Sequence, residues 1–298
     1  MQGKIFVVIP VYNRVLHTLA CLRCLAGQTD ANFRVILVND GSTDDTKAAV
    51  LQQFPWVTIL DTVTERWWTG STNDGITYVM HEACPGDYIL LLNNDLELHP
   101  DFITTFRASA TKHGRRTLIG AVVLSKQDQK TIIDGGAIKH WRKRRKEGPI
   151  SIQLFASDHV ETNVGSLTGR GVLYPIEVFA QFGLFDDIHF KQCGDTEFPI
   201  RLKRKGYSLV VDYGCRVYMN CEDSFTANVA TSVSLCMWHH YFFDVRSNCN
   251  LKYTYYLCRA MSGTSFFFIP HLIYAYCLTI GGFLKAVILT AFGGRVPR

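Results

Sequence analysis

The chain has 298 residues, more than one small domain needs and fewer than two full-sized domains need, so its length predicts one large α/β domain with an appendage. Apolar residues make up 47% of the sequence and charged residues 19%, which excludes an intrinsically disordered protein and allows a sizeable core. Lys and Arg number 31 against 26 Asp and Glu, and the resulting net charge of +5 is too small to indicate a polyanionic partner by itself.

The ten cysteines do not indicate a disulfide scaffold, because the chain is long and its first ten residues lack the apolar core and cleavage site of a signal peptide. We therefore expect a reduced, cytoplasmic protein whose cysteines act as small apolar residues. Cys21 and Cys24 form a C-x-x-C pair inside a helical pattern, without the second pair that a zinc site requires. The pattern favours core packing over redox or metal chemistry for both residues.

Short apolar strands alternate with helical stretches through the first hundred residues. The sequence predicts strands at Ile5–Ile9, Arg34–Val38, Val57–Leu60 and Asp87–Leu92, and helices at Val15–Leu25, Thr46–Phe54 and Asp74–Ala83. Such alternation predicts a mainly parallel sheet covered by helices on both faces. Ligands of these sheets bind beyond the carboxyl ends of the strands.

Polar residues stand where three of these strands end. The ends read Pro10-Val11-Tyr12-Asn13, Asn39-Asp40-Gly41-Ser42 and Asn93-Asn94-Asp95. Asp40 fits a turn residue and the recognition of a base or ribose about equally well. Asp95, flanked by amides, suits a hard divalent cation held partly by substrate phosphates. Neither the P-loop motif nor the dinucleotide-binding glycine motif follows the first strand, which argues against those two classes of enzyme.

A further acidic cluster lies in the second half, at Gly194-Asp195-Thr196-Glu197-Phe198. Asp195 precedes a helical run, so it fits an N-cap with Glu197 in the first turn. It fits equally well a general base that faces an acceptor hydroxyl.

These segments together resemble the inverting family 2 glycosyltransferases of GT-A fold, in particular the bacterial rhamnosyltransferase-like branch. The resemblance covers roughly residues 4 to 250 and rests on six segments in family order: Val8–Arg14, Val38–Asp44, Trp67–Gly75, Leu91–Asp95, Leu167–Gly171, and Gly183–Asp186 followed by Gly194–Phe198. It implies a GT-A α/β fold, Rossmann-like, with a mainly parallel sheet.

The resemblance also implies roles for particular residues. The donor-binding residues would be Pro10, Val11, Tyr12, Asn13, Asp40, Gly70, Asn73 and Asn94, with Asp40 reading a pyrimidine base. Asp95 would hold Mg²⁺ or Mn²⁺, and Asp195 would be the catalytic base. The acceptor side would contain Trp68, Arg170 and Glu197.

Two departures from the family pattern stand out. Gly194 replaces the Glu that precedes the family's catalytic Asp, and Asn220 replaces a His that binds the metal in many relatives. His239 and His240 are candidate substitutes for that third ligand. The departures keep open a non-catalytic homologue that binds nucleotide sugars or glycans. A nucleotidyltransferase is a further alternative, although the loop after the first strand lacks the Gly-rich, basic sequence that this class needs.

The implied function is inverting, metal-dependent transfer of a sugar in polysaccharide biosynthesis. The donor would be a UDP- or dTDP-sugar, with dTDP-rhamnose among the candidates, and the acceptor a hydroxyl of a glycan or lipid-linked saccharide. Residues 1–225 would form the catalytic domain, with the donor half at about 1–100 and the acceptor half at about 101–225. Residues 226–298 would form a helical, membrane-associating extension.

The last part of the sequence carries the membrane prediction. Between Ala260 and Leu284 there is no charged residue, a length that spans a bilayer core of about 30 Å. Pro270, His271 and Gly281-Gly282 interrupt the stretch and favour shorter helical pieces. Interfacial or re-entrant attachment at the cytoplasmic face ranks first, a span second and a buried helix pair third. The flanking basic residues, which suit anionic headgroups, are Lys252, Arg259, Lys285, Arg295 and Arg298.

A second basic stretch runs from Lys139 to Lys146. We expect a solvated loop there, then a surface for an anionic acceptor or lipid headgroups, and only last a nucleic-acid site. No nucleic-acid partner is therefore expected.

Overall fold

The computed structural model of the chain describes residues 3–62, 65–136, 138–140, 145–147, 157–220, 234–247, 249–262 and 265–292. The sheet region comprises β1 (Ile5–Val11), α1 (Val15–Ala26), β2 (Phe33–Asn39), α2 (Thr46–Gln53), β3 (Thr58–Asp61), α3 (Trp67–Glu82), β4 (Tyr88–Leu91), β5 (Leu96–Leu98), α4 (Phe102–His113), β6 (Thr117–Ser125), β7 (Ile132–Asp134), β10 (Val160–Glu161), β11 (Val172–Pro175), α5 (Glu177–Phe182), α6 (Gly194–Arg204) and β12 (Ser208–Met219). The helices that follow are the short 3₁₀ turn Leu235–Met237, α7 (Trp238–Phe243), α8 (Leu251–Ser262) and α9 (Ser265–Ala291).

Ten of the described strands form one mixed sheet. Its main order is β10-β12-β6-β11-β4-β1-β2-β3, with β5 paired to β12 and β7 paired to β6. The pairs β1–β2, β1–β4, β2–β3 and β6–β12 are parallel, while β11 runs antiparallel between β4 and β6. The predicted α/β fold with a mostly parallel sheet is confirmed.

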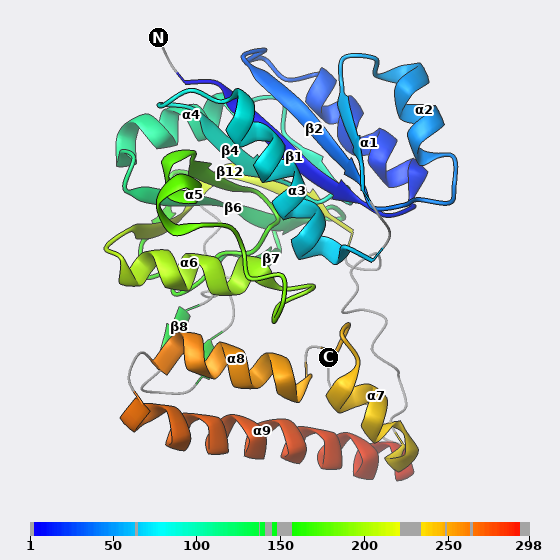
Figure 1. The fold of residues 1–298 in the computed structure, drawn as a ribbon, viewed down its shortest axis with the longest axis vertical. Helices are drawn as coiled ribbons and strands as arrows, with labels where there is room; N and C mark the ends of the chain where they lie inside the picture. The colour runs from blue at the N-terminus through cyan, green and yellow to red at the C-terminus, as the bar shows by residue number, and fades with distance from the viewer. Residues whose placement is uncertain are drawn as a thin grey trace.

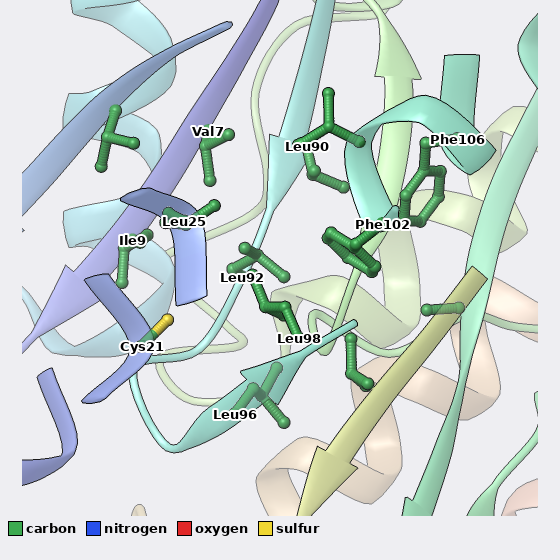
Figure 2. Close-up of a cluster of buried hydrophobic side chains, with 14 of the residues drawn as sticks. Val7, Ile9, Cys21, Leu25, Leu90, Leu92, Leu96, Leu98, Phe102 and Phe106 are labelled. Atoms are coloured by element: carbon green, nitrogen blue, oxygen red, sulfur yellow. The ribbon is translucent and has the colours of Figure 1, made fainter. Parts of the chain in front are cut away.

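Two apolar layers cover the sheet. Alternate residues of β1 face opposite ways, so Val7 and Ile9 pack under α1 and α4, while Phe6 and Val8 pack under α3, α5 and α6. Figure 2 shows the first layer, in which Phe102 and Phe106 of α4 lie beside Leu90. This packing fixes the three strands whose carboxyl ends carry the polar residues.

The cysteines of α1 are part of this layer. Cys21 is 1% exposed among the residues of the first layer, and Cys24 packs against its edge. Burial raises the pKa of the Cys21 thiol well above its ordinary range, which keeps the side chain neutral and apolar. The prediction of core packing for this pair is confirmed.

Helix α3 begins seven residues earlier than the sequence pattern predicts, at Trp67 instead of Asp74. Its first two turns contain the buried polar residues Thr69, Ser71, Thr72 and Asn73, so they show no apolar periodicity. The carboxylate of Asp40 accepts hydrogen bonds from the N–H groups of Arg66 (3.2 Å) and Trp67 (3.0 Å), which satisfies donors at the start of this helix.

The prediction that Pro270 and Gly281-Gly282 break the apolar tail into pieces is wrong, because α9 is one helix of 27 residues. Pro270 lies near the start of α9, where a missing backbone N–H removes few hydrogen bonds from the helix. Gly282 lies opposite α7, where a Cβ atom would be 3.9 Å from the Tyr241 hydroxyl. Helices α8 and α9 lie side by side beneath α6 and the sheet (Figure 1).

The middle of the basic stretch 139–146, residues 141–144, falls outside the described residues. Its flanks form the antiparallel strands β8 (Ile138–His140) and β9 (Arg145–Glu147), where a solvated loop was expected.

Candidate functional site

Three polar strand ends meet at one edge of the sheet. Strands β4, β1 and β2 are neighbours and parallel, so Asn93–Asp95, Pro10–Asn13 and Asn39–Ser42 follow them at the same edge. The arrangement expected from the sequence is therefore present, and the positions of the individual side chains decide what it can bind.

The loop after β1 is tied to the loop after β2 through Asn13. The Asn13 side-chain oxygen accepts hydrogen bonds from the N–H groups of Thr43 (2.8 Å) and Asp44 (3.3 Å), and its own N–H donates to Ser42 Oγ (2.8 Å). Pro10 and Val11 are buried in the strand, whereas Tyr12 is 57% exposed. Of this predicted donor-binding group, Tyr12 has the side chain most open to a ligand, and Asn13 braces the loop.

Asp40 is buried and already bonded within the chain. Besides the N–H groups of Arg66 and Trp67, its carboxylate accepts a hydrogen bond from the hydroxyl of Thr62 (3.1 Å). Asp40 therefore holds Thr62, Arg66 and Trp67 at the sheet edge. Its contact with a nucleobase stays a prediction.

Gly70 and Asn73 lie inside α3. A Cβ atom on Gly70 would stand 3.3 Å from the Arg66 guanidinium carbon, and Arg66 makes a two-pronged ion pair with Asp74 (2.9 and 2.7 Å). Asn73 is buried, and its amide bonds both the C=O (2.9 Å) and the N–H (3.1 Å) of Phe185. Asn73 thus anchors the segment that leads to α6, and its predicted place beside a donor is untested.

The triplet after β4 divides its side chains between different partners. Asn93 accepts a hydrogen bond from the indole N–H of Trp68 (2.9 Å), and Asn94 donates one to the hydroxyl of Thr18 (2.9 Å). Asp95 points to the Arg14 guanidinium, 3.4 Å from one carboxylate oxygen. Its other oxygen, Oδ1, is buried and has no hydrogen-bond partner in the described part of the chain.

That buried oxygen bears on whether a divalent cation fits. Mg²⁺ is commonly held by one or two carboxylates together with substrate phosphates and waters. Asp95 offers one carboxylate of this kind, with an oxygen that nothing else in the described chain satisfies. A single-carboxylate site completed by a diphosphate therefore fits these residues.

The side chains considered for the third ligand have other partners, although Asn220 follows Met219, which pairs with Leu96, and so lies beside Asp95 in the register of β5 and β12. Asn220 accepts a hydrogen bond from Gln127, His240 lies 2.9 Å from Asp244 and His239 packs against Phe243. Within the described residues, no group of three or more His, Cys, Asp and Glu side chains is arranged to hold a metal ion.

Asp195 lies at the start of α6 and accepts a short hydrogen bond from the N–H of Gly169 (2.6 Å). Tyr253 of α8 reaches the same turn, where its hydroxyl hydrogen-bonds Thr196 and lies close enough to Asp195 to feel its charge. Burial raises the pKa of Tyr253 far above its ordinary value, so this hydroxyl stays neutral. Sequence reasoning missed Tyr253, because only tertiary packing brings α8 to this turn.

Gly194 has a steric reason to lack a side chain. A Cβ atom there would fall 2.5 Å from Cγ2 and 2.9 Å from Oγ1 of Thr69. The Thr69 hydroxyl accepts the N–H of Gly194 (3.1 Å) and donates to the C=O of Phe190. Thr69 thus fills the space that the family's Glu side chain would enter, and it ties α3 to the turn that carries Asp195.

Trp68 links the two segments that carry the candidate carboxylates. Its indole N–H binds Asn93, two residues before Asp95, and its ring edge lies where a Cβ on Gly169 would be, 2.4 Å from Cζ2. Gly169 in turn donates to Asp195. A side chain at position 169 is therefore excluded, and one aromatic residue contacts both the segment before the candidate metal carboxylate and the glycine that binds the candidate base.

The other two acceptor-side candidates have partners of their own. Glu197 is 8% exposed and pairs with Arg201 (3.0 Å), and burial raises its pKa despite that cation. Arg170 follows Gly169 and stands 3.7 Å from Asp134. Of the three, Trp68 is the one that contacts a neighbour of each carboxylate, Asn93 on one side and Gly169 on the other.

A comparison with solved structures gives the class of protein. The mannosyltransferase PcManGT from Pyrobaculum calidifontis, solved in complex with GDP-Man and Mn²⁺, superposes on all of this chain and 77% of its own, with a TM-score of 0.54 and 13% identity. With the mixed sheet described above, this likeness shows a GT-A fold.

Comparisons of sequence give the family. The model described as "Glycosyl transferase family 2" matches residues 6–174, more than half of the chain, and the chain belongs to this family. It is 24% identical over 223 residues to the N-acetylglucosaminyl-diphospho-decaprenol L-rhamnosyltransferase of Mycobacterium tuberculosis, a match that covers 70% of this chain and 73% of the relative. It is 29% identical over 228 residues to the O-antigen biosynthesis protein RfbC of Myxococcus xanthus, a match that covers 70% of this chain and 16% of that protein. The rhamnosyltransferase-like branch expected from the motifs is confirmed.

Proposed function

We propose that this glycosyltransferase moves a sugar from a UDP- or dTDP-sugar, with dTDP-rhamnose the first donor to test, to a hydroxyl of a glycan or lipid-linked saccharide, with inversion at the anomeric carbon. The name of the mycobacterial relative, a rhamnosyltransferase with a diphospho-decaprenol acceptor, supports this choice of donor and acceptor. Family membership favours sugar transfer over nucleotidyl transfer.

One observation carries the proposal: Trp68 links the two segments that carry the carboxylates, since its indole N–H binds Asn93, two residues before Asp95, and its ring packs on Gly169, whose N–H binds Asp195. Asp95 presents a buried oxygen without a partner in the described chain, and Asp195 is held by the Gly169 N–H. The two carboxylates therefore suit different roles, one toward a leaving group and one toward an attacking hydroxyl.

Asp195 would accept the proton of the acceptor hydroxyl as its oxygen attacks the anomeric carbon. The Gly169 hydrogen bond, the Thr69 tie to Gly194 and the Thr196–Tyr253 contact fix the turn that carries this carboxylate, so its orientation is set before the acceptor arrives. A single displacement of this kind inverts the anomeric centre and needs no protein nucleophile.

Asp95 would hold a divalent cation, Mg²⁺ or Mn²⁺, together with the diphosphate. Such a cation supplies positive charge for the leaving nucleoside diphosphate. The similar fold of PcManGT was solved with Mn²⁺ and GDP-Man together, which supports testing Mn²⁺ first.

The experiment that tests the function is a panel of nucleotide sugars incubated with the protein and Mn²⁺, followed by the release of nucleoside diphosphate. We expect one UDP- or dTDP-sugar to be consumed, and Asp95→Asn to remove the metal dependence of nucleoside diphosphate binding. Binding without turnover of any donor, with or without saccharide acceptors, would instead indicate the non-catalytic homologue.

We further propose that α9 attaches the protein to the cytoplasmic face of a membrane. The segment Phe266–Ala291 is long and apolar enough to cross a bilayer, with a mean hydropathy of 1.9, and only 11% of its most apolar window is buried. One face carries an exposed apolar stripe at spacings of three and four residues: Phe266, Ile269, Ile273, Cys277, Ile280, Leu284 and Ile288. After Asp244 the sequence contains no Asp or Glu and six Lys or Arg, which suits anionic headgroups.

The opposite face of α9 favours attachment in the membrane plane over a span. Phe283 packs on Tyr241 and Phe242 of α7 at ring distances of 4.9 and 5.1 Å. His271 lies 3.2 Å from Ser262 at the end of α8, and the Tyr276 hydroxyl binds the C=O of Leu251 (3.2 Å). A span would break these contacts, whereas an in-plane helix keeps them and inserts only the stripe.

The stripe residue Cys277 lies near the middle of α9 and can report depth. With exposed Cys84 and Cys236, and Cys221 outside the described residues, changed to Ser, a fluorophore on Cys277 should be quenched best by lipids brominated near the headgroup, at about 5–10 Å depth. Quenching centred on the bilayer midplane, about 15 Å deep, would indicate a span instead.

A further inference from the structure

Arg14 is the cation that the structure places on the candidate metal carboxylate. Its guanidinium is 3.4 Å from Asp95 Oδ2, with side-chain exposures of 42% for Arg14 and 14% for Asp95. This contact is the one side-chain hydrogen bond that Arg14 makes within the part of the chain that the structure describes. The guanidinium thus lies on the carboxylate that would hold a divalent cation.

The backbone around Arg14 is held in a rare conformation. Asn13 and Arg14 have φ angles of 59° and 63°, two successive left-handed residues without a glycine. Hydrogen bonds from Thr43 and Asp44 to the Asn13 side chain hold the first, and the Val15 N–H donates to Asp44 (3.1 Å) just after the second. The loop therefore fixes where the Arg14 side chain leaves the backbone.

The charges explain why a cation is needed at this place before any ligand binds. Asp95 is mostly buried, and a carboxylate without a counter-charge in such a place destabilises the fold. Arg14 supplies that charge from a long, half-exposed stem, so it can leave without unpacking the core. Its planar guanidinium also matches phosphate oxygens, which it can bind through two N–H groups at once.

We propose that Arg14 is an exchangeable counter-ion: it pairs with Asp95 in the donor-free protein and re-pairs with the donor diphosphate when a divalent cation takes Asp95. This rests on the proposed function and adds a diphosphate-binding residue to it. Arg14 and the cation are then rivals for Asp95 in the free protein and partners on the diphosphate in the complex.

Competition with the cation for Asp95 and joint binding of the diphosphate predict opposite effects of replacing Arg14. Arg14→Gln should bind Mn²⁺ alone about two- to fivefold more tightly than the wild type, because a half-exposed ion pair no longer competes. The same variant should bind dTDP or UDP in EDTA about fivefold or more weakly, because a charge-assisted contact to phosphate is lost. Arg14→Lys should have affinities for Mn²⁺ and for dTDP or UDP between those of the wild type and Arg14→Gln.

The experiment uses the full chain at low ionic strength. Free Mn²⁺ is followed by electron paramagnetic resonance in titrations without nucleotide, and dTDP and UDP binding by calorimetry in EDTA. Arg23→Gln, an exposed arginine in the last turn of the same helix, is the matched control and should change neither affinity. Thermal unfolding of each variant shows that the loop is still folded.

A double-mutant cycle separates a static ion pair from an exchanging one. Asp95→Asn should remove Mn²⁺ binding and strengthen dTDP or UDP binding in EDTA, because Arg14 is no longer drawn away, and adding Arg14→Gln should abolish that gain. If Arg14→Gln binds Mn²⁺ no more tightly than the wild type, or binds the diphosphate in EDTA equally well, Arg14 is a structural partner of Asp95 and the inference is wrong. If the wild type with Mn²⁺ binds neither dTDP nor UDP, the proposed donor class fails and the role of Arg14 fails with it.

Discussion

The sheet region and α9 use the same apolar residue types in opposite ways. Leu90 of β4 is completely buried between two helical layers, whereas Leu284 of α9 is 48% exposed. In the sheet region most large apolar side chains are buried in the two layers, and a buried polar atom such as Asp95 Oδ1 lacks a hydrogen-bond partner in the described chain. In α9 the polar groups are satisfied within the helix, and the apolar stripe is what lacks a partner in the described chain. What each region leaves unpaired indicates what it binds: a charged ligand in one and an apolar phase in the other.

Helix α8 packs against α6 of the sheet region as well as against α9. Tyr253 packs edge-on against Phe190, Tyr256 lies 3.7 Å from the His189 ring, and Arg204 of α6 donates to the C=O of Ala260. A version of the protein without the membrane helix should therefore end after Ser262. A cut inside α8 would remove contacts next to Asp195.

The largest expected effect comes from the same substitution made in both regions. Leu90→Ala should lower the free energy of unfolding by about 2–5 kcal/mol, because it leaves a cavity in a close-packed layer. Leu284→Ala should change it by less than about 0.5 kcal/mol, because the side chain is half exposed. Urea unfolding in detergent measures both, and a large loss for Leu284→Ala would show that the stripe is packed core.

Asp195→Asn should lower turnover at least about a hundredfold, while donor binding and unfolding stay near wild type. Asn keeps an oxygen that can accept the Gly169 N–H, so the turn should hold its shape. Single-turnover rates measure the loss of turnover, and calorimetry measures whether donor binding is kept. The N-cap of α6 is Cys193, so turnover near the wild-type value would reduce Asp195 to a residue that only holds Gly169 in place.

Gly194→Ala should destabilise the protein by about 1–3 kcal/mol, because the new Cβ would stand 2.5 Å from Thr69 Cγ2. Thr69→Ser keeps the hydroxyl that bonds Gly194 and Phe190 and removes that methyl group. The double variant should therefore recover part of the loss. Equal losses for the single and double variants would mean that Thr69 is not the obstacle.

The sequence predicts the sheet well because its signal is local. Alternating apolar strands ending in Asn13, Asp40 and Asp95 are visible as short runs, and the structure brings these ends to one edge. Contacts across long separations are not visible in this way. Thr69 meets Gly194 across 125 positions, and the start of α3 depends on Asp40, 26 and 27 positions earlier. The unbroken α9 was missed because Pro270 and the glycines were weighed without the neighbouring helices that support them.

Leu284→Glu should weaken binding to liposomes about tenfold, because the charged side chain would have to enter the headgroup–acyl boundary with the stripe. Leu51→Glu is the matched control, since Leu51 is 52% exposed on α2, in the sheet region. Flotation with liposomes compares the two variants, and both should unfold like the wild type. Equal binding of the two would show that α9 does not insert.

The smallest expected effect concerns salt, and it separates the two forces that would hold α9 to a membrane. Exposed Lys252, Arg259 and Lys285 should each contribute about 1 kcal/mol to binding of anionic vesicles. At 1 M NaCl the Debye length falls to about 3 Å and removes most of this attraction, whereas insertion of the apolar stripe is insensitive to screening. We therefore expect salt to release only part of the protein, and Lys252→Gln with Arg259→Gln to reduce the salt-sensitive part. Sedimentation with anionic and neutral vesicles at low and high salt measures both contributions. Complete release by salt alone would leave the stripe outside the lipid and make the attachment purely electrostatic.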